Sequence, residues 1–122
     1  SRRQRQMCIR DRVLAVFDAY QDHAEFDYEN GFRGCGLLNA AAEMPANSAE
    51  RAAVNRHKQE VKAIVKRELS ELPITEPGRI EQLTEHVCFL LEGSISLAGL
   101  AADTQAIERA RTMADQLIEQ SL

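Results

Sequence analysis

The chain has 122 residues, a length that suits one domain with a single core. Ala, Leu, Glu, Gln and Arg are abundant, aromatic residues are few and Trp is absent, so the composition favours helices over sheet. The net charge is −4; residues 1–12 contribute +4, which leaves −8 for residues 13–122. Such an acidic body excludes a broad surface for nucleic acid.

The cysteines and the hydropathy pattern indicate where the protein works. Three cysteines stand at positions 8, 35 and 88, an odd number without a CxxC pair, which predicts neither a disulfide framework nor a zinc site. The most apolar stretch, residues 87–102, is too short to span a bilayer, and the arginine-rich start has no signal-peptide pattern. We therefore expect a cytoplasmic protein that does not enter a membrane.

The first expected helix runs from Ile9 to Asp27. Residues 1–11 form a basic head that we place outside the domain, as a tail, a linker remnant or an artefact, so that the domain covers residues 12–122. The helix ends before Asn30-Gly31, a strong turn signal. One face of it is apolar at spacings of three and four: Ile9, Val13, Val16, Phe17, Tyr20 and Ala24.

The second expected helix is short and rich in alanine. A Gly34-Cys35-Gly36 corner leads into it, it covers about residues 35–44, and Pro45 stops it. Because alanine is thin and a good helix former, this element suits the crowded centre of an all-helical domain.

The third expected helix is long, about residues 48–72. Asn47 is its predicted N-cap, with Glu50 completing a capping box, and Pro73 ends it. Pro77 is predicted to open the next helix at its first position. The buried stripe of the third helix consists of Val54, His57, Val61, Ile64, Val65, Leu69 and Leu72.

The last two expected helices, about residues 78–101 and 104–121, favour a dimer. The fourth is apolar over more than half its circumference and carries small residues, so it needs a partner besides its own core. We predict a homodimer in which these two helices and their symmetry mates form a four-helix bundle; the alternative is that the chain itself covers them. The predicted interface residues are Val87, Leu91, Ser94, Ile95, Ala98, Ala110, Met113, Ala114 and Leu117.

The residues capable of chemistry do not form an active-site pattern. His23, His57 and His86 are far apart, so no metal site is predicted, and no nucleophile elbow or phosphate loop appears. Cys35, at a helix N-terminus, is either a reactive thiol or a small buried residue. His86 suits an interface as well as a ligand site. We expect no cofactor and no enzymatic activity.

A cavity between the first four helices is the remaining candidate site. Apolar walls with a few orienting polar groups are typical of small-molecule pockets, and plain core packing is the alternative. The residues expected to line it are Phe17, Tyr20, Leu38, Asn39, His57, Val61 and Phe89.

Four segments in order resemble the C-terminal regulatory domain of tetracycline-repressor (TetR) family regulators. Residues 32–43, Phe-Arg-Gly-Cys-Gly-Leu-Leu-Asn-Ala-Ala-Ala-Glu, resemble the family's RGC-x-L-x-N-A-x-x-E segment. His57-Lys58 in the long helix, residues 90–95 (Leu-Leu-Glu-Gly-Ser-Ile) and residues 106–117 also agree. The resemblance covers about residues 12–120.

The resemblance implies a helical homodimer that binds a small-molecule effector. Effector binding would change the spacing of two N-terminal helix-turn-helix heads and release operator DNA. That DNA-binding part is expected upstream of residue 12 and is missing from this chain. Two other functions stay open: a thiol-based redox sensor acting through Cys35 or Cys88, and a purely structural helical dimer.

Overall fold

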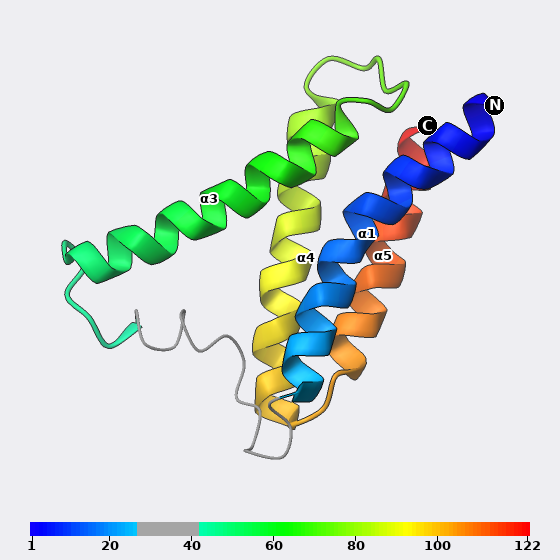
Figure 1. Ribbon diagram of the computed structural model, residues 1–122. Helices are drawn as coiled ribbons and strands as arrows, with labels where there is room; N and C mark the ends of the chain where they lie inside the picture. The colour runs from blue at the N-terminus through cyan, green and yellow to red at the C-terminus, as the bar shows by residue number, and fades with distance from the viewer. Residues whose placement is uncertain (27–41) are drawn as a thin grey trace.

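The computed structural model describes residues 1–26 and 42–122, and every regular element in that part is a helix (Figure 1). The all-α prediction is therefore confirmed. The described helices are four rather than about five: α1 (Arg2–Phe26), α3 (Ala49–Leu69), α4 (Arg79–Ala101) and α5 (Gln105–Ser121). The expected alanine helix lies almost wholly outside the described residues, as do Cys35, Leu38 and Asn39.

Helix α1 begins at Arg2, seven residues before the predicted start at Ile9. The hydroxyl of Ser1 accepts a hydrogen bond from the backbone N–H of Gln4 (3.3 Å), and the arginines and glutamines that follow are good helix formers. The division expected between residues 11 and 12 thus falls inside a continuous helix. The domain boundary between residues 11 and 12 stays a prediction.

Helix α3 is capped by Ser48, whereas the sequence suggested Asn47. The Ser48 hydroxyl accepts a hydrogen bond from the N–H of Arg51 (3.2 Å), which satisfies one of the free donors of the first turn. The helix ends at Leu69, and the Ser70 hydroxyl donates to the carbonyl of Lys66 (2.7 Å). Leu72 is buried although it lies beyond the helix.

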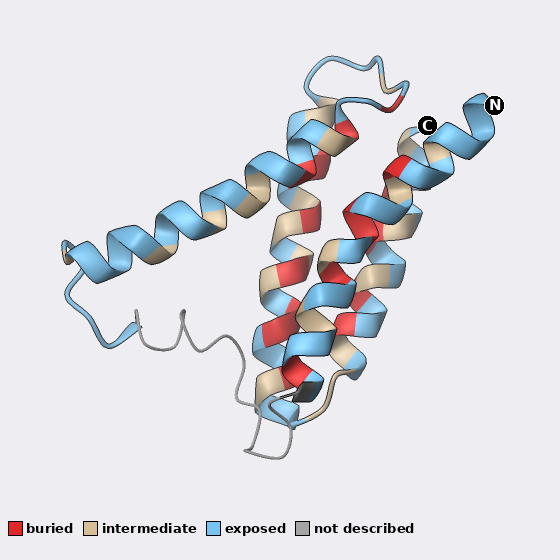
Figure 2. Cartoon of the chain, in the orientation of Figure 1, coloured by how far each residue is buried: buried red, intermediate tan, exposed pale blue. Residues whose placement is uncertain are grey.

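Among the described residues, the C-terminal half of α3 makes most of the packing contacts of this helix with the rest of the chain. Its fully buried residues, Val65 and Leu69, both lie in that half. The N-terminal half extends away from α1, α4 and α5, and most of it is exposed (Figures 1 and 2).

Helices α4 and α5 form an antiparallel hairpin, as predicted. Gly78, with a φ of +78°, precedes α4 and takes the N-cap position, so Pro77 lies one residue before the cap. Ala102 (φ +57°) ends α4, and its turn leads directly into α5. Because α5 contacts α1 and α4 while α3 contacts α4 and α1, the four helices enclose one core.

Arginine side chains hold α1 against its neighbours. Arg10 pairs with Asp115 and Glu119 on α5, and Arg12 pairs with Glu68 of α3 at 2.7 Å. Asp18 accepts from Arg111 at 2.8 Å. None of the described helices is long and apolar enough to cross a membrane.

Candidate dimer and effector sites

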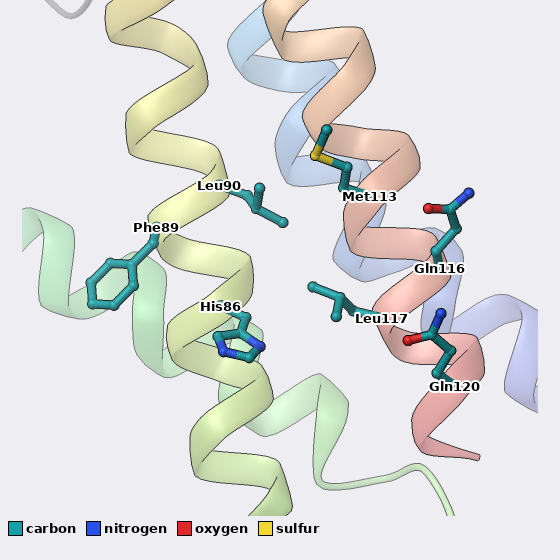
Figure 3. A pocket seen from close by; sticks show the side chains of 7 residues that line it. All are labelled: His86, Phe89, Leu90, Met113, Gln116, Leu117 and Gln120. Atoms are coloured by element: carbon teal, nitrogen blue, oxygen red, sulfur yellow. The ribbon is translucent and has the colours of Figure 1, made fainter.

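An apolar groove runs between α4 and α5 on the side away from α1 (Figure 3). Its volume is about 560 Å³. Phe89 is 70% exposed and Met113 is 49% exposed, unusually high fractions for large apolar side chains. The lining residues are His86, Phe89, Leu90, Met113, Gln116, Leu117 and Gln120.

The apolar surface continues along α4 beyond the groove. Leu97 is 60% exposed and Leu100 is 85% exposed, and they follow Phe89 and Gly93 at intervals of three and four residues. These positions share one side of the helix. We call the groove residues together with Gly93, Leu97 and Leu100 the outer face.

Gly93 lies in the middle of the outer face. A glycine inside a helix costs stability relative to alanine, by roughly 0.5–1 kcal/mol. A Cβ at this position would meet nothing within 4 Å in its own chain, so intramolecular packing does not require the glycine. A small residue there would let a second helix approach closely.

Most of the residues predicted for a dimer interface lie inside the protomer and not on its surface. Seven of them are buried in the protomer's own core: Val87, Leu91, Ser94, Ile95, Ala98, Ala110 and Ala114. Ser94 satisfies its hydroxyl locally by donating to the carbonyl of Leu91 (3.0 Å). Met113 and Leu117 alone of the nine line the groove. Because α4 is apolar over more than half its circumference, its sequence does not distinguish the apolar side that faces the core from the apolar side that faces out.

The residues predicted to line one effector cavity are also separated. Phe17 is fully buried in the core, His57 is exposed, and Phe89 belongs to the outer face. Tyr20 and Val61 are half-buried and pack against the core. The described residues of the predicted set thus lie at different depths, Leu38 and Asn39 lie outside the described residues, and the shared effector cavity stays a prediction.

A polar cluster that the sequence analysis missed joins three helices. Lys58 of α3 lies 3.0 Å from the carboxylate of Glu92 on α4 and donates to the hydroxyl of Tyr20 on α1 (3.3 Å). The Tyr20 hydroxyl donates to Glu92 at 3.1 Å. The Lys58 ammonium also lies 5.2 Å from the centre of the Tyr20 ring, within cation–π range.

The cluster shifts the acidities of its members. Burial lowers the pKa of Lys58, but the hydrogen bond and charge of Glu92 together with the contact to Tyr20 outweigh that effect, and the pKa is raised. Burial is the main cause that raises the pKa of Tyr20; the nearby carboxylate of Glu92 also raises it, and Lys58 lowers it, with a net rise. Lys58 is therefore a cation and Tyr20 a neutral phenol at physiological pH. The sequence singles out Lys58 beside His57 but does not connect it with Tyr20 or Glu92, because these partners lie 38 and 34 residues away along the chain.

The described thiols are separate from this cluster and from each other. Cys8 is exposed and Cys88 is half-buried. Burial raises the pKa of Cys88; the charge of Lys62 lowers it, the carboxylates of Glu92 and Glu85 raise it, and the net shift is upward. No group of three or more His, Cys, Asp or Glu side chains among the described residues is arranged to hold a metal ion.

Comparison with known proteins identifies the family. Neither a curated protein nor a solved structure gives a significant match. The model of the tetracycline repressor-like C-terminal domain matches residues 10–114, which is most of the chain, and this agrees with the ordered sequence segments and with the helical fold. The chain belongs to the family of tetracycline repressor-like C-terminal domains.

Proposed function

We propose that this chain is the ligand-sensing and dimerisation domain of a TetR-like transcriptional repressor that acts in the cytoplasm. Domains of this family are regulatory, and they typically dimerise and bind small molecules. In this proposal, effector binding controls operator binding by an N-terminal helix-turn-helix. The observation that carries the dimerisation half is the outer face of α4 and α5.

An exposed apolar surface of this kind needs a cover. Phe89, Leu97, Leu100 and Met113 expose about half or more of their surface, and they lie on two adjacent antiparallel helices. Contiguous apolar patches on a monomer usually mark an interaction site. A second copy related by a two-fold axis would place its own α4 and α5 on this face and complete a four-helix bundle.

The experiment is a mass measurement by light scattering at micromolar concentration. We expect twice the 13.7 kDa of one chain. Leu97→Glu and Met113→Glu should each give the single-chain mass, because a charge at a desolvated apolar contact is costly.

The matched control is Ile64→Glu. Ile64 is 46% exposed on α3, outside the outer face, so its variant should keep the double mass. A single-chain mass for the unmodified protein would contradict the proposed dimer. A double mass that survives both outer-face substitutions would instead place the interface elsewhere.

The ligand-sensing half has a separate test. A library of small molecules screened by thermal shift on the intact chain should contain compounds that raise Tm, because a ligand that binds only the folded state stabilises it. A dimer that no compound stabilises would support the purely structural alternative.

A further inference from the structure

A second hollow lies beside the N-terminal half of α3, the half that leaves the bundle (Figure 1). Its volume is about 510 Å³. Most of the lining comes from one side of the helix, where Arg51, Val54, Asn55 and Lys58 follow at intervals of three, one and three residues. The described residues that line it are Ala46, Asn47, Ser48, Arg51, Ala52, Val54, Asn55 and Lys58.

The charge of this lining has one sign. It contains two cations, Arg51 and Lys58, and none of the described side chains that line it is acidic. This contrasts with residues 13–122 as a whole, which carry a net charge of −8. The remaining lining combines amides and a hydroxyl with the apolar Ala46, Ala52 and Val54. A positive end beside apolar walls suits an anion that carries a hydrocarbon body.

The two cations differ in depth. Arg51 is exposed, and its guanidinium donates to the backbone carbonyl of Met44 at 3.4 Å. The Lys58 side chain is only 16% exposed and is held by Glu92 and Tyr20. Seven residues of helix separate the two Cα atoms by about 10 Å, so Arg51 stands at the outer end of the hollow and Lys58 at the inner end.

We propose that this hollow is the effector site and that the effector is an amphipathic organic carboxylate, whose carboxylate takes Lys58 in competition with Glu92. The inference rests on the ligand-sensing function proposed above and names the chemical class of its ligand. Arg51 attracts the anion at the entrance, and Ala46, Ala52 and Val54 contact the apolar body. Asn55 provides a hydrogen bond between the two ends.

Competition for Lys58 connects this site to the dimer. The ion pair of Lys58 with Glu92 (3.0 Å) and the hydrogen bond to Tyr20 (3.3 Å) join α3 to α4 and α1. Phe89 and Gly93 of the outer face lie within three residues of Glu92 on the same helix. A carboxylate that draws Lys58 away weakens the joint between α3 and the helix that carries the outer face, and by linkage the dimer state changes effector affinity in return.

The test compares matched charged and neutral probes. Octanoate and 1-naphthoate are titrated into the intact chain by calorimetry beside octanamide and 1-naphthamide, which keep the shape and lose the charge. We expect the carboxylates to bind at least about tenfold more tightly than the amides, since hydrogen bonds to an ionised partner are about twice as strong as neutral ones. Equal affinity for acids and amides, or no binding of any of the four probes, would overturn the proposal.

Variants locate the site. Lys58→Gln should weaken octanoate binding about tenfold or more, and Arg51→Gln by a smaller factor because that side chain is exposed. Arg56→Gln is the control: Arg56 is an exposed cation on the opposite side of α3 and should leave the affinity unchanged. Equal losses in Arg56→Gln and Lys58→Gln would show a general charge effect and reject the site.

Glu92→Gln tests the competition for Lys58 independently, so the proposal can still be tested if the Lys58→Gln variant does not fold. It keeps the acceptor for Tyr20 and removes the charge that opposes the ligand, so octanoate should bind more tightly than to the unmodified chain. Unchanged or weaker binding in a folded Glu92→Gln variant would reject the competition for Lys58. The two proposals fail separately: neutral compounds that raise Tm while carboxylates do not would leave ligand sensing standing and remove only the anionic class.

Discussion

Cys88 illustrates how the surroundings of a single residue decide its chemistry. A thiol attacks as the thiolate, so a redox sensor needs a lowered thiol pKa and exposure. Cys88 has the opposite combination, because it is half-buried and burial together with Glu92 and Glu85 raises its pKa. The structure therefore gives no support to a redox function for Cys88, and Cys35 lies outside the described residues.

We predict that Cys88 reacts more slowly than the exposed Cys8 in the folded chain. Iodoacetamide at neutral pH, followed by mass spectrometry of the peptides, should modify Cys8 first, and the two rates should converge in urea. The Cys88 rate should rise as the pH is raised, since the thiolate fraction increases. Modification of Cys88 as fast as Cys8 in the native protein would restore the sensor hypothesis.

At the scale of the element, the two halves of α3 are held differently by the described residues. Val65 and Leu69 bury its C-terminal half, whereas its N-terminal half has the cap at Ser48 and the contacts of Lys58. Because most helical stability comes from packing, the more exposed half should respond locally to loss of its cap.

We predict that Ser48→Ala speeds amide exchange in the first turns of α3 about fivefold, which corresponds to the roughly 1 kcal/mol that a cap contributes. Asn47→Ala is the matched control and should have little effect, since the hydrogen bond to Arg51 comes from Ser48. Exchange should be unchanged around Val65. A larger effect from Asn47→Ala would return the cap to the position that the sequence suggested.

The joint of α1, α3 and α4 predicts a loss of stability at alkaline pH. Lys58 and Tyr20 both have raised pKa values, so the folded state holds these protons more tightly than the unfolded state. Their contribution is fully present below the unfolded-state pKa values, which are about 10, and is lost as the pH rises through the higher folded-state values.

Urea unfolding at about pH 9 and about pH 11 measures this loss. The urea concentration at the unfolding midpoint should be lower at the higher pH. The decrease should be smaller in the double variant Tyr20→Phe/Lys58→Met, because this variant has lost the two titrating groups. An equal fall in both proteins would show that other groups cause the alkaline loss.

At the scale of the whole molecule, a substitution of Gly93 should have opposite effects on the stability of one chain and on that of the proposed dimer. A Cβ there meets nothing within the chain, so Gly93→Ala should stabilise the protomer by up to about 1 kcal/mol through helix propensity. The same methyl group should weaken the proposed dimer, because it would lie where we propose that the second helix approaches. Urea unfolding of Gly93→Ala in a monomeric outer-face variant measures the first effect. The molecular mass of Gly93→Ala, measured by light scattering over a dilution series, measures the second. Gly93→Ala that leaves dimer affinity unchanged would remove Gly93 from the interface.

The helices were predictable from the sequence, and the sites were only partly so. The bounds of α4 and α5 differ by one residue at most from the expected ranges, because Gly78 and the Ala102–Thr104 turn are strong local signals. Of the residues predicted for a dimer interface, Met113 and Leu117 line the groove, whereas Val87 and Leu91 are buried in the protomer's own core. Tyr20 was expected beside a ligand pocket, but its contact with Lys58 and Glu92 was not anticipated.

The sequence by itself determined the helical class, the faces that each helix can bury and the family. These depend on residue spacing and on ordered segments, which are properties of the chain read along its length. Only the tertiary structure decided which side of α4 faces its own core and which side, with Phe89 and Leu97, is left open. It also decided that Lys58 meets Glu92 and Tyr20. The spacing of residues along one helix does not tell which face or charge of a distant helix it will contact, because these contacts depend on how whole helices pack.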